Sequence, residues 1–171
     1  IKNYGSNDYF EVYIGSKFNK KGYLHYGEVI LPGKSKKEIL ISTYICHPSM
    51  ANNELSGPLV SIALINFFKK IYLKKTLRFL FLPETIGAIA YINNNLKKLK
   101  KNVIGGYVLT CIGDDRNFSY LYTKYKNSFS DRAAINAFQK LKINYKKYSF
   151  LERGSDERQF NSPGIDLNIG S

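Results

Sequence analysis

Histidine and carboxylate side chains follow two short apolar runs in this sequence. His47 and Glu54 come after the apolar run 39–45, and Glu84 comes just after the apolar run 77–82. A histidine together with carboxylates is a ligand set that proteins use for zinc, and a free Glu beside a metal-activated water is the usual general base of metal-assisted hydrolysis. Acidic residues at strand ends are also common on protein surfaces, and Glu54 or Glu84 could instead cap the helices predicted after them. The residue types alone leave a metal site and a capping role both open.

Further acidic residues follow later parts of the chain. Asp114 comes after the apolar run 103–112, and Asp156 and Glu157 lie in the dense polar loop 152–160. If the apolar runs are parallel strands, their carboxyl ends lie at one edge of the sheet, where open α/β folds place their ligands. We therefore expect these acidic residues to face the same cleft as the first group. Asp156 has an alternative role in an Asx-type turn that satisfies its own backbone.

Strand-like and helix-like patterns alternate along most of the chain. Continuous apolar runs rich in β-branched residues are typical of strands covered on both faces, and apolar residues at helical spacing predict helices between them. The predicted strands are 39–45, 77–82, 103–112, 145–151 and 165–169, and the predicted helices are 58–73, 88–99 and 130–141. Ser130 or Asp131 could cap the last helix, and residues 117–128 are expected to form a surface hairpin or excursion. This order predicts an α/β fold with a mainly parallel sheet.

The first 33 residues show a different pattern. Apolar and polar residues alternate at a period of two, which predicts two or three β-strands that end at the turn Leu31-Pro32-Gly33. We expect residues 1–33 to be the β-rich end of a neighbouring or inserted domain, and residues 34–171 to form the α/β domain. The chain starts without a Met and without a signal-peptide pattern, so we expect it to be a piece of a longer protein.

The net charge of +13 raises nucleic acid as a class of partner. We favour a different interpretation, because Lys, Asn, Ile and Tyr are all abundant, as codon bias in an AT-rich genome produces. The lysines fall in short clusters typical of a solvated face, and no recognised nucleic-acid motif accompanies them. We therefore expect no nucleic-acid partner. A nucleic-acid binder would instead show salt-sensitive binding to DNA or RNA.

Cysteine count and hydropathy constrain the setting of the protein. Cys46 and Cys111 make no convincing disulfide framework, and neither has metal-ligand spacing to a second cysteine. No apolar run reaches the ~18 residues of a membrane span, so no membrane contact is expected. A cytoplasmic location is the default expectation, and oligomerisation is left open.

Four motifs in the same order resemble a known protein family. Residues 46–57, 83–87, 109–114 and 154–159 together resemble the aminopeptidase-like domain proteins that are associated with surface-polysaccharide gene clusters. Those proteins in turn resemble, more distantly, the zinc-dependent aminopeptidases of the zinc exopeptidase superfamily. The resemblance covers nearly all of residues 22–171, and it implies a three-layer, phosphorylase/hydrolase-like α/β fold.

Three ligand positions of the zinc aminopeptidases are changed in this sequence. Tyr44 stands where those enzymes have a ligand His, Asn53 where they have a metal-bridging Asp, and Thr85 where the second residue of a Glu-Glu pair is a ligand. Glu84 keeps the position of the general base. An Asn brings no charge with which to bridge two cations, and tyrosine is seldom a zinc ligand. The resemblance therefore implies that an ordinary dinuclear zinc site is absent.

The late polar loop also matches a motif of these enzymes. Ser155, Asp156 and Glu157, followed by Phe160, resemble a Ser-Asp-His loop followed by Phe, which implies that this loop lies near the site. The final ligand His of those enzymes lies beyond this motif, after Ser171. We therefore expect the domain to be incomplete at its C-terminus.

These comparisons predict a rearranged, single-metal zinc site. Its predicted ligands are His47, Glu54 and Asp114, its general base is Glu84, and the predicted substrate-binding residues are Asn53, Asp156, Glu157 and Arg158. The first functional hypothesis is a zinc-dependent aminopeptidase-like hydrolase that cleaves an amide bond in a small peptide or aminoacyl amide. The alternative is a catalytically inactive binding or scaffold domain of the same fold, linked to surface-polysaccharide biosynthesis. Because a catalytic zinc needs about three protein ligands, we expect this chain by itself to bind zinc weakly and to show little peptidase activity.

Overall fold

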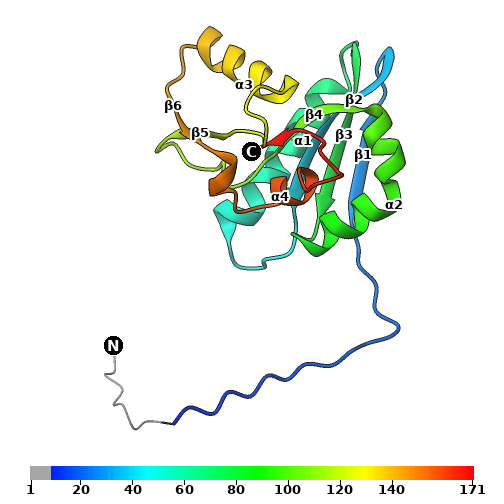
Figure 1. The fold of residues 1–171 in the computed structure, drawn as a ribbon, viewed down its shortest axis with the longest axis vertical. Coiled ribbons are helices and arrows are strands. Elements are labelled where there is room, and N and C mark those ends of the chain that lie inside the picture. The colour runs from blue at the N-terminus through cyan, green and yellow to red at the C-terminus, as the bar shows by residue number, and fades with distance from the viewer. Residues whose placement is uncertain (1–8) are drawn as a thin grey trace.

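Five strands form the central sheet of the protein. The computed structural model describes residues 9–171, and its main sheet has the order β1-β3-β2-β4-β7 (Figure 1). These strands are β1 Gly27–Leu31, β2 Ser35–Tyr44, β3 Lys75–Leu82, β4 Val103–Val108 and β7 Ile169–Gly170. β1 is antiparallel to β3, whereas β2 is parallel to β3 and to β4, and β4 is parallel to β7. The predicted α/β fold with a mainly parallel sheet is confirmed.

Helices cover both faces of this sheet and give three layers. They are α1 Ser56–Phe68, which follows the π-helical turn Ala51–Leu55, then α2 Ile86–Asn102 and the short α4 Glu157–Phe160. α2 and α4 pack on one face through a core of Leu40, Leu80, Leu82, Ala88, Tyr91, Ile92, Leu99, Val108 and Phe160. α1 packs on the other face through Ile41, Leu64, Ile65, Phe68, Leu77 and Phe79. Within residues 9–171, no helix has the length and apolar character needed to span a bilayer.

A buried ion cluster ties β1, β2, β3 and α2 together. Arg78 in β3 is 1% exposed, donates from Nε to Glu38 at 2.6 Å, and pairs through Nη1 with Glu28. Nη1 also donates to the hydroxyl of Tyr91 at 3.1 Å. Burial by itself lowers the pKa of the Arg78 guanidinium, but the hydrogen bonds to Glu38 and Glu28 outweigh it and raise the pKa above its ordinary value. Arg78 therefore stays charged inside the protein.

The segment before β1 departs from the predicted pattern. Residues 9–26 form no helix or strand, are exposed, and extend away from the folded body (Figure 1). The prediction of strands is wrong for residues 9–26, because alternation at a period of two makes a strand only where a neighbouring strand supplies hydrogen bonds. Residues 27–31 find such a neighbour in β3 and join the sheet of the α/β domain. Residues 1–8 of the predicted N-terminal unit lie outside the described residues.

A second, two-stranded sheet stands beside the main one. β5 Phe118–Leu121 and β6 Tyr145–Tyr148 are parallel, and α3 Phe129–Lys140 connects them. The expected hairpin at residues 117–128 is therefore wrong, because β5 pairs with a later strand across a helical crossover.

The N-cap of α3 also lies earlier than predicted. Ser128 and Asp131 form a capping box, in which each side chain accepts the backbone N–H of the other residue. The predicted caps, Ser130 and Asp131, are instead inside the first turn. The pattern of Ser followed three residues later by an acidic residue is the signal that would have located this cap.

Candidate functional site

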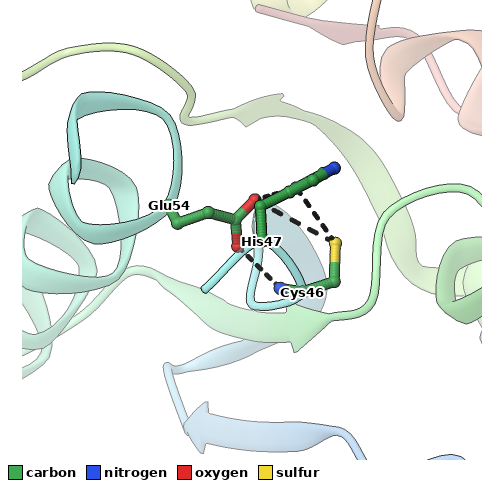
Figure 2. Close-up of side chains that lie close together, drawn as sticks. All are labelled: Cys46, His47 and Glu54. Carbon is green, nitrogen blue, oxygen red and sulfur yellow. Dashed lines mark hydrogen bonds and ion pairs between the residues drawn. The ribbon is translucent and has the colours of Figure 1, made fainter. Parts of the chain in front are cut away.

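The carboxyl end of β2 carries a dense group of ionisable side chains. After β2 ends at Tyr44, Cys46 and His47 face Glu54, which lies in the π-helical turn before α1 (Figure 2). Cys46 Sγ lies 3.4 Å from His47 Nδ1 and 4.0 Å from Glu54 Oε1. His47 Nδ1 contacts Glu54 Oε1 directly. These three residues, which we call the Cys-His-Glu cluster, bring a thiol, an imidazole and a carboxylate within 4.8 Å of one another.

Hydrogen bonds set the charges in the Cys-His-Glu cluster. The hydrogen bond with Glu54 raises the pKa of His47 above its ordinary value. Burial raises the pKa of the Glu54 carboxyl, but hydrogen bonds from His47 and from the backbone N–H of Cys46, at 2.6 Å, outweigh burial and hold that pKa below its ordinary value. Burial also raises the pKa of the Cys46 thiol. These shifts favour the charged forms of His47 and Glu54 and the protonated form of the Cys46 thiol.

This arrangement does not form a nucleophilic triad. In such a triad the imidazole contacts the nucleophile through one ring nitrogen and the orienting carboxylate through the other. Here Cys46 and Glu54 both lie at the same nitrogen, Nδ1 of His47. The raised pKa of the Cys46 thiol also disfavours a nucleophilic role.

Glu84 enters the site from the loop after β3. β2 and β3 are parallel neighbours with Tyr44 opposite Leu82, so the loops that follow them lie side by side. A carboxylate oxygen of Glu84 lies 3.9 Å from His47 Nε2, and the backbone N–H of Glu84 donates to Cys46 Sγ at 3.2 Å. The expected proximity of Glu84 to His47 is confirmed.

Asp156 supports the loop that carries Glu84. Thr85 has a φ of 62°, which is rare for a β-branched residue, and its N–H donates to Asp156 Oδ1 at 2.8 Å. Asp156 is fully buried, and its Oδ2 has no hydrogen-bond partner among residues 9–171. Burial raises the pKa of Asp156 to about 6. A strained backbone held by a buried, perturbed carboxyl is typical of functional sites.

Glu157 lies next to Asp156 and is also buried. Its Oε1 accepts the backbone N–H groups of Gly154 and Ser155, at 2.9 and 3.0 Å. Its Oε2 is buried and forms no hydrogen bond within the described part of the chain. One oxygen of Glu157 thus shapes the loop, and the other is left without a partner among the described residues.

A cavity of about 920 Å³ adjoins this edge of the sheet. Tyr44, Cys111, Ser155 and Glu157 line it, together with the aromatic residues Tyr107, Phe118, Tyr120, Phe138 and Tyr148. A mostly apolar, aromatic cavity with a few polar groups is a common form of small-molecule site. The cavity therefore has the character of a site for a small ligand. None of Cys46, His47, Glu54 and Glu84 lines it, and the Cys-His-Glu cluster lines a separate cavity of about 640 Å³.

Tyr44, Asn53 and Thr85 stand at positions that the resemblance aligns with metal ligands of the zinc aminopeptidases. In this protein they contact other parts of the chain. The hydroxyl of Tyr44 contacts that of Thr110, and burial raises the pKa of Tyr44. Asn53 Nδ2 lies 3.6 Å from Cys111 Sγ, while Asn53 Oδ1 is buried without a partner among the described residues. Thr85 contributes its backbone N–H to Asp156, as described above. These neutral side chains provide no charged ligands for a second cation.

Asp114 and Arg158 lie apart from the cluster. Asp114 is exposed and accepts hydrogen bonds from Arg116 Nε and Nη2 at 3.0 and 2.9 Å, and from Asn52 Nδ2 at 2.9 Å. The hydrogen bonds from Arg116 hold the pKa of Asp114 well below its ordinary range. Arg158 is exposed. Its positive charge lowers the pKa of Asp156 by less than burial raises it. The structure therefore brings His47, Glu54 and Glu84 together, but not Asp114.

Sequence reasoning missed Cys46 as a member of this group. The search for metal-ligand spacing looked for a second cysteine, and the chain has only two, both free. The available signal was the direct adjacency of Cys46 and His47 at a strand end, eight and seven residues before Glu54.

A family model described as a domain of unknown function, DUF4910, matches residues 10–171. The chain belongs to the DUF4910 family. A Clostridium acetobutylicum protein, whose name joins polysaccharide biosynthesis with an aminopeptidase-like domain, is 43% identical over 169 residues, which are 96% of this chain and 38% of that protein. The DUF4910 chain thus spans about two fifths of the length of that relative. The resemblance to aminopeptidase-like domain proteins is confirmed.

Solved structures show the same fold. A crystal structure described as that of a peptidase from Clostridium acetobutylicum has a TM-score of 0.82 and 42% identity, over 85% of this chain and 34% of that one. The zinc aminopeptidase BSAP from Bacillus subtilis has a TM-score of 0.66 and 18% identity, over 85% of this chain and 38% of that one. The DUF4910 domain therefore has the fold of the zinc aminopeptidases.

The side chains fit a zinc ion at the Cys-His-Glu cluster, but not at the positions of the dinuclear site of the zinc aminopeptidases. Tyr44, Asn53 and Thr85 offer neither the charge nor the ligand types of a dinuclear site. The Cys-His-Glu cluster fits, because thiolate sulfur, imidazole nitrogen and carboxylate oxygen are the three ligand types that zinc takes from proteins.

Proposed function

We propose that this DUF4910 domain is a zinc-dependent, aminopeptidase-like hydrolase that cleaves an amide bond in a small peptide or aminoacyl amide. The observation that carries the proposal is the position of the Glu84 carboxylate, 3.9 Å from His47 Nε2 and beside the Cys-His-Glu cluster. A free carboxylate next to zinc-type ligands is the arrangement of metal-assisted hydrolysis. The fold shared with zinc aminopeptidases adds support.

The residues of the site have separate roles in this proposal. His47 and Glu54 hold the zinc, which when bound polarises a carbonyl group and lowers the pKa of a water molecule. Glu84 accepts the proton of the attacking water and passes it to the leaving amine. Glu84 is suited to this role because no Lys or Arg side chain pairs with it in residues 9–171. Asp156 fixes the Glu84 loop through the backbone of Thr85.

The neighbouring cavity gives the proposal a place for the substrate. Its aromatic walls suit the side chain of a peptide or aminoacyl amide, and Tyr44 and Glu157 add polar groups to its lining. Asn53 has a buried oxygen without a protein partner in the described chain, which keeps it a candidate for a hydrogen bond to the substrate. The exposed Arg158 stays a candidate for substrate contact.

The test is made with the full-length protein. Zinc is measured by elemental analysis, and hydrolysis of aminoacyl amides is measured with added zinc and with a chelator, for the wild type and for Glu84→Gln. We expect stoichiometric zinc, turnover that the chelator abolishes, and a loss of kcat of about 100-fold or more in Glu84→Gln with zinc content unchanged. Glu11→Gln is the matched control, because Glu11 is an exposed carboxylate in the extended segment before β1. Equal turnover of the two variants would contradict the role of Glu84.

A second candidate function is a catalytically inactive binding or scaffold domain linked to surface-polysaccharide biosynthesis. The neutral residues Tyr44, Asn53 and Thr85 favour it, because each is engaged in contacts within the protein at a position where related enzymes bind metal. The name of the Clostridium acetobutylicum relative provides the polysaccharide link. This function predicts no stoichiometric zinc and no hydrolysis, so the experiment above separates the two candidates.

A further inference from the structure

We infer that Cys46 is a metal ligand, so that zinc is held by a thiolate, an imidazole and a carboxylate from Cys46, His47 and Glu54. The inference deepens the proposed function and rests on its zinc-binding part, but not on hydrolysis. Cys46 takes the place of Asp114 as the third predicted ligand, because Asp114 is hydrogen-bonded to Arg116 and Asn52. Three protein ligands leave one position of a tetrahedral zinc ion open, as in catalytic sites.

The spacing of the donor atoms suits a single ion. In a tetrahedral site with a Zn–S distance of about 2.3 Å and a Zn–N distance of about 2.1 Å, the sulfur and the nitrogen lie about 3.6 Å apart. Cys46 Sγ and His47 Nδ1 are 3.4 Å apart, and Cys46 Sγ and Glu54 Oε1 are 4.0 Å apart. His47 and Glu54 share a hydrogen bond, so the ion takes the place of that proton and moves the two atoms apart.

Groups outside the cluster hold each donor in place. The second oxygen of Glu54 accepts the backbone N–H of Cys46 at 2.6 Å, which leaves Oε1 to face the thiol and the imidazole. The backbone N–H of Glu84 donates to Cys46 Sγ at 3.2 Å, an interaction that favours a thiolate. The carboxylate of Glu84 lies 3.9 Å from the other ring nitrogen, Nε2, and so leaves Nδ1 to face the ion. The site is therefore organised around the donor atoms before an ion binds.

Ion binding also has a defined proton balance. When the three donors bind zinc, the thiol of Cys46 releases its proton to solvent. The proton that His47 and Glu54 share in their hydrogen bond is released as well. Zinc affinity should therefore rise with pH.

Cobalt provides a direct readout of a thiolate ligand. The metal-free protein, kept reduced with a phosphine, is titrated with Co²⁺ alone and followed by absorption spectroscopy. We expect a thiolate-to-cobalt charge-transfer band that saturates at an equimolar ratio and is removed by zinc. Cys46→Ser should abolish the band and weaken zinc binding by about 100-fold or more, since even residues behind the ligands contribute 10–100-fold.

The second cysteine of the chain is the matched control. Cys111 is free and exposed, and its Sγ contacts Asn53 and Thr110 instead of the cluster. Cys111→Ser should keep both the charge-transfer band and the zinc affinity. In the wild type, zinc should slow alkylation of Cys46 by iodoacetamide, and mass spectrometry should show unchanged alkylation of Cys111. This measurement needs no variant to fold.

Each contrary result is distinct. Saturable Co²⁺ binding without the charge-transfer band, a band that persists in Cys46→Ser, or no protection of Cys46 by zinc overturns the inference. The absence of saturable metal binding overturns both the inference and the zinc-dependent function. A saturating band without turnover of any amide overturns hydrolysis alone and leaves Cys46 as a ligand.

Discussion

The imidazole of His47 lies between two carboxylates, with Nδ1 bonded to Glu54 and Nε2 3.9 Å from Glu84. The two carboxylates come from different parts of the chain, since Glu54 precedes α1 and Glu84 follows β3. The parallel pairing of β2 with β3 brings them to the same imidazole. A histidine in this position responds to changes in either carboxylate.

Glu54→Gln should lower the pKa of His47 in the metal-free protein. The hydrogen bond with Glu54 is the main cause of the raised pKa, and a neutral amide does not favour the imidazolium. Because the folded state raises this pKa, the stabilisation from His47 is full below the ordinary value of about 6.5 and is lost as pH rises through the folded value. The measurement is an NMR titration of the His47 ring protons, with Glu152→Gln as the control. An unchanged pKa in Glu54→Gln would contradict the hydrogen bond as its cause.

The placement of His47 and Glu84 could be predicted from the sequence. Runs 39–45 and 77–82 are apolar on both faces, which is typical of buried parallel strands, and the first residues after such strands share one edge of the sheet. The pattern of apolar residues thus predicted that the loops after these two strands lie next to each other. The α/β fold followed from the same runs.

Other features depend on contacts that a linear pattern does not contain. The role of Cys46 depends on the turn after β2, which directs its thiol toward His47 and Glu54. Asp114 also follows a strand, but its neighbour Arg116 binds it instead. The alternating residues 9–26 lack a neighbouring strand, so their pattern predicted strands that do not form.

Asp156→Asn should remove a pH-dependent loss of stability. The pKa of Asp156 is about 6 in the folded protein and about 3.9 when unfolded, so the folded state binds the proton more tightly. The resulting stability is full below about pH 4 and is lost as pH rises through about 6, which amounts to about 3 kcal/mol. An Asn can still accept the N–H of Thr85 and carries no charge. Urea unfolding at pH 4 and pH 7 should therefore show a smaller difference for Asp156→Asn than for the wild type.

Asp131→Asn is the contrasting variant for this measurement. Burial raises the pKa of Asp131, but hydrogen bonds from Thr123 and Ser128 outweigh burial and hold the pKa below its ordinary value. Stability from this carboxylate is therefore present above the unfolded pKa and is lost as pH falls. Asp131→Asn should destabilise the protein more at pH 7 than at pH 4. The same pH trend for Asp156→Asn would show that Asp156 is not a raised-pKa carboxyl.

Arg78→Leu should destabilise the fold strongly. Removing the guanidinium leaves the buried carboxylate of Glu38 and the partly buried carboxylate of Glu28 without their cation. Breaking one partner of a buried ion pair costs about 3–5 kcal/mol. Arg116→Leu removes the cation of the exposed pair with Asp114 and should cost far less, because exposed ion pairs contribute little to stability. Chemical denaturation of the two variants measures the difference, and equal losses would contradict a structural role for the buried cluster.

Gly57→Ala should destabilise the protein although alanine favours helices. Gly57 lies in the first turn of α1, and a Cβ atom there would lie 2.2 Å from Thr43 Oγ1 and 2.4 Å from the backbone oxygen of Leu109. The side chain of Thr43 and the backbone of the segment after β4 would have to shift. Such overpacking costs about 1–3 kcal/mol, which exceeds the roughly 0.5–1 kcal/mol that Ala gains over Gly in a helix. Gly154→Ala is the control, because nothing lies within 4 Å of its added Cβ. Thermal and chemical denaturation should show a loss for Gly57→Ala and little change for Gly154→Ala. A Gly57→Ala variant as stable as the wild type would mean that α1 can move away from β2 without cost.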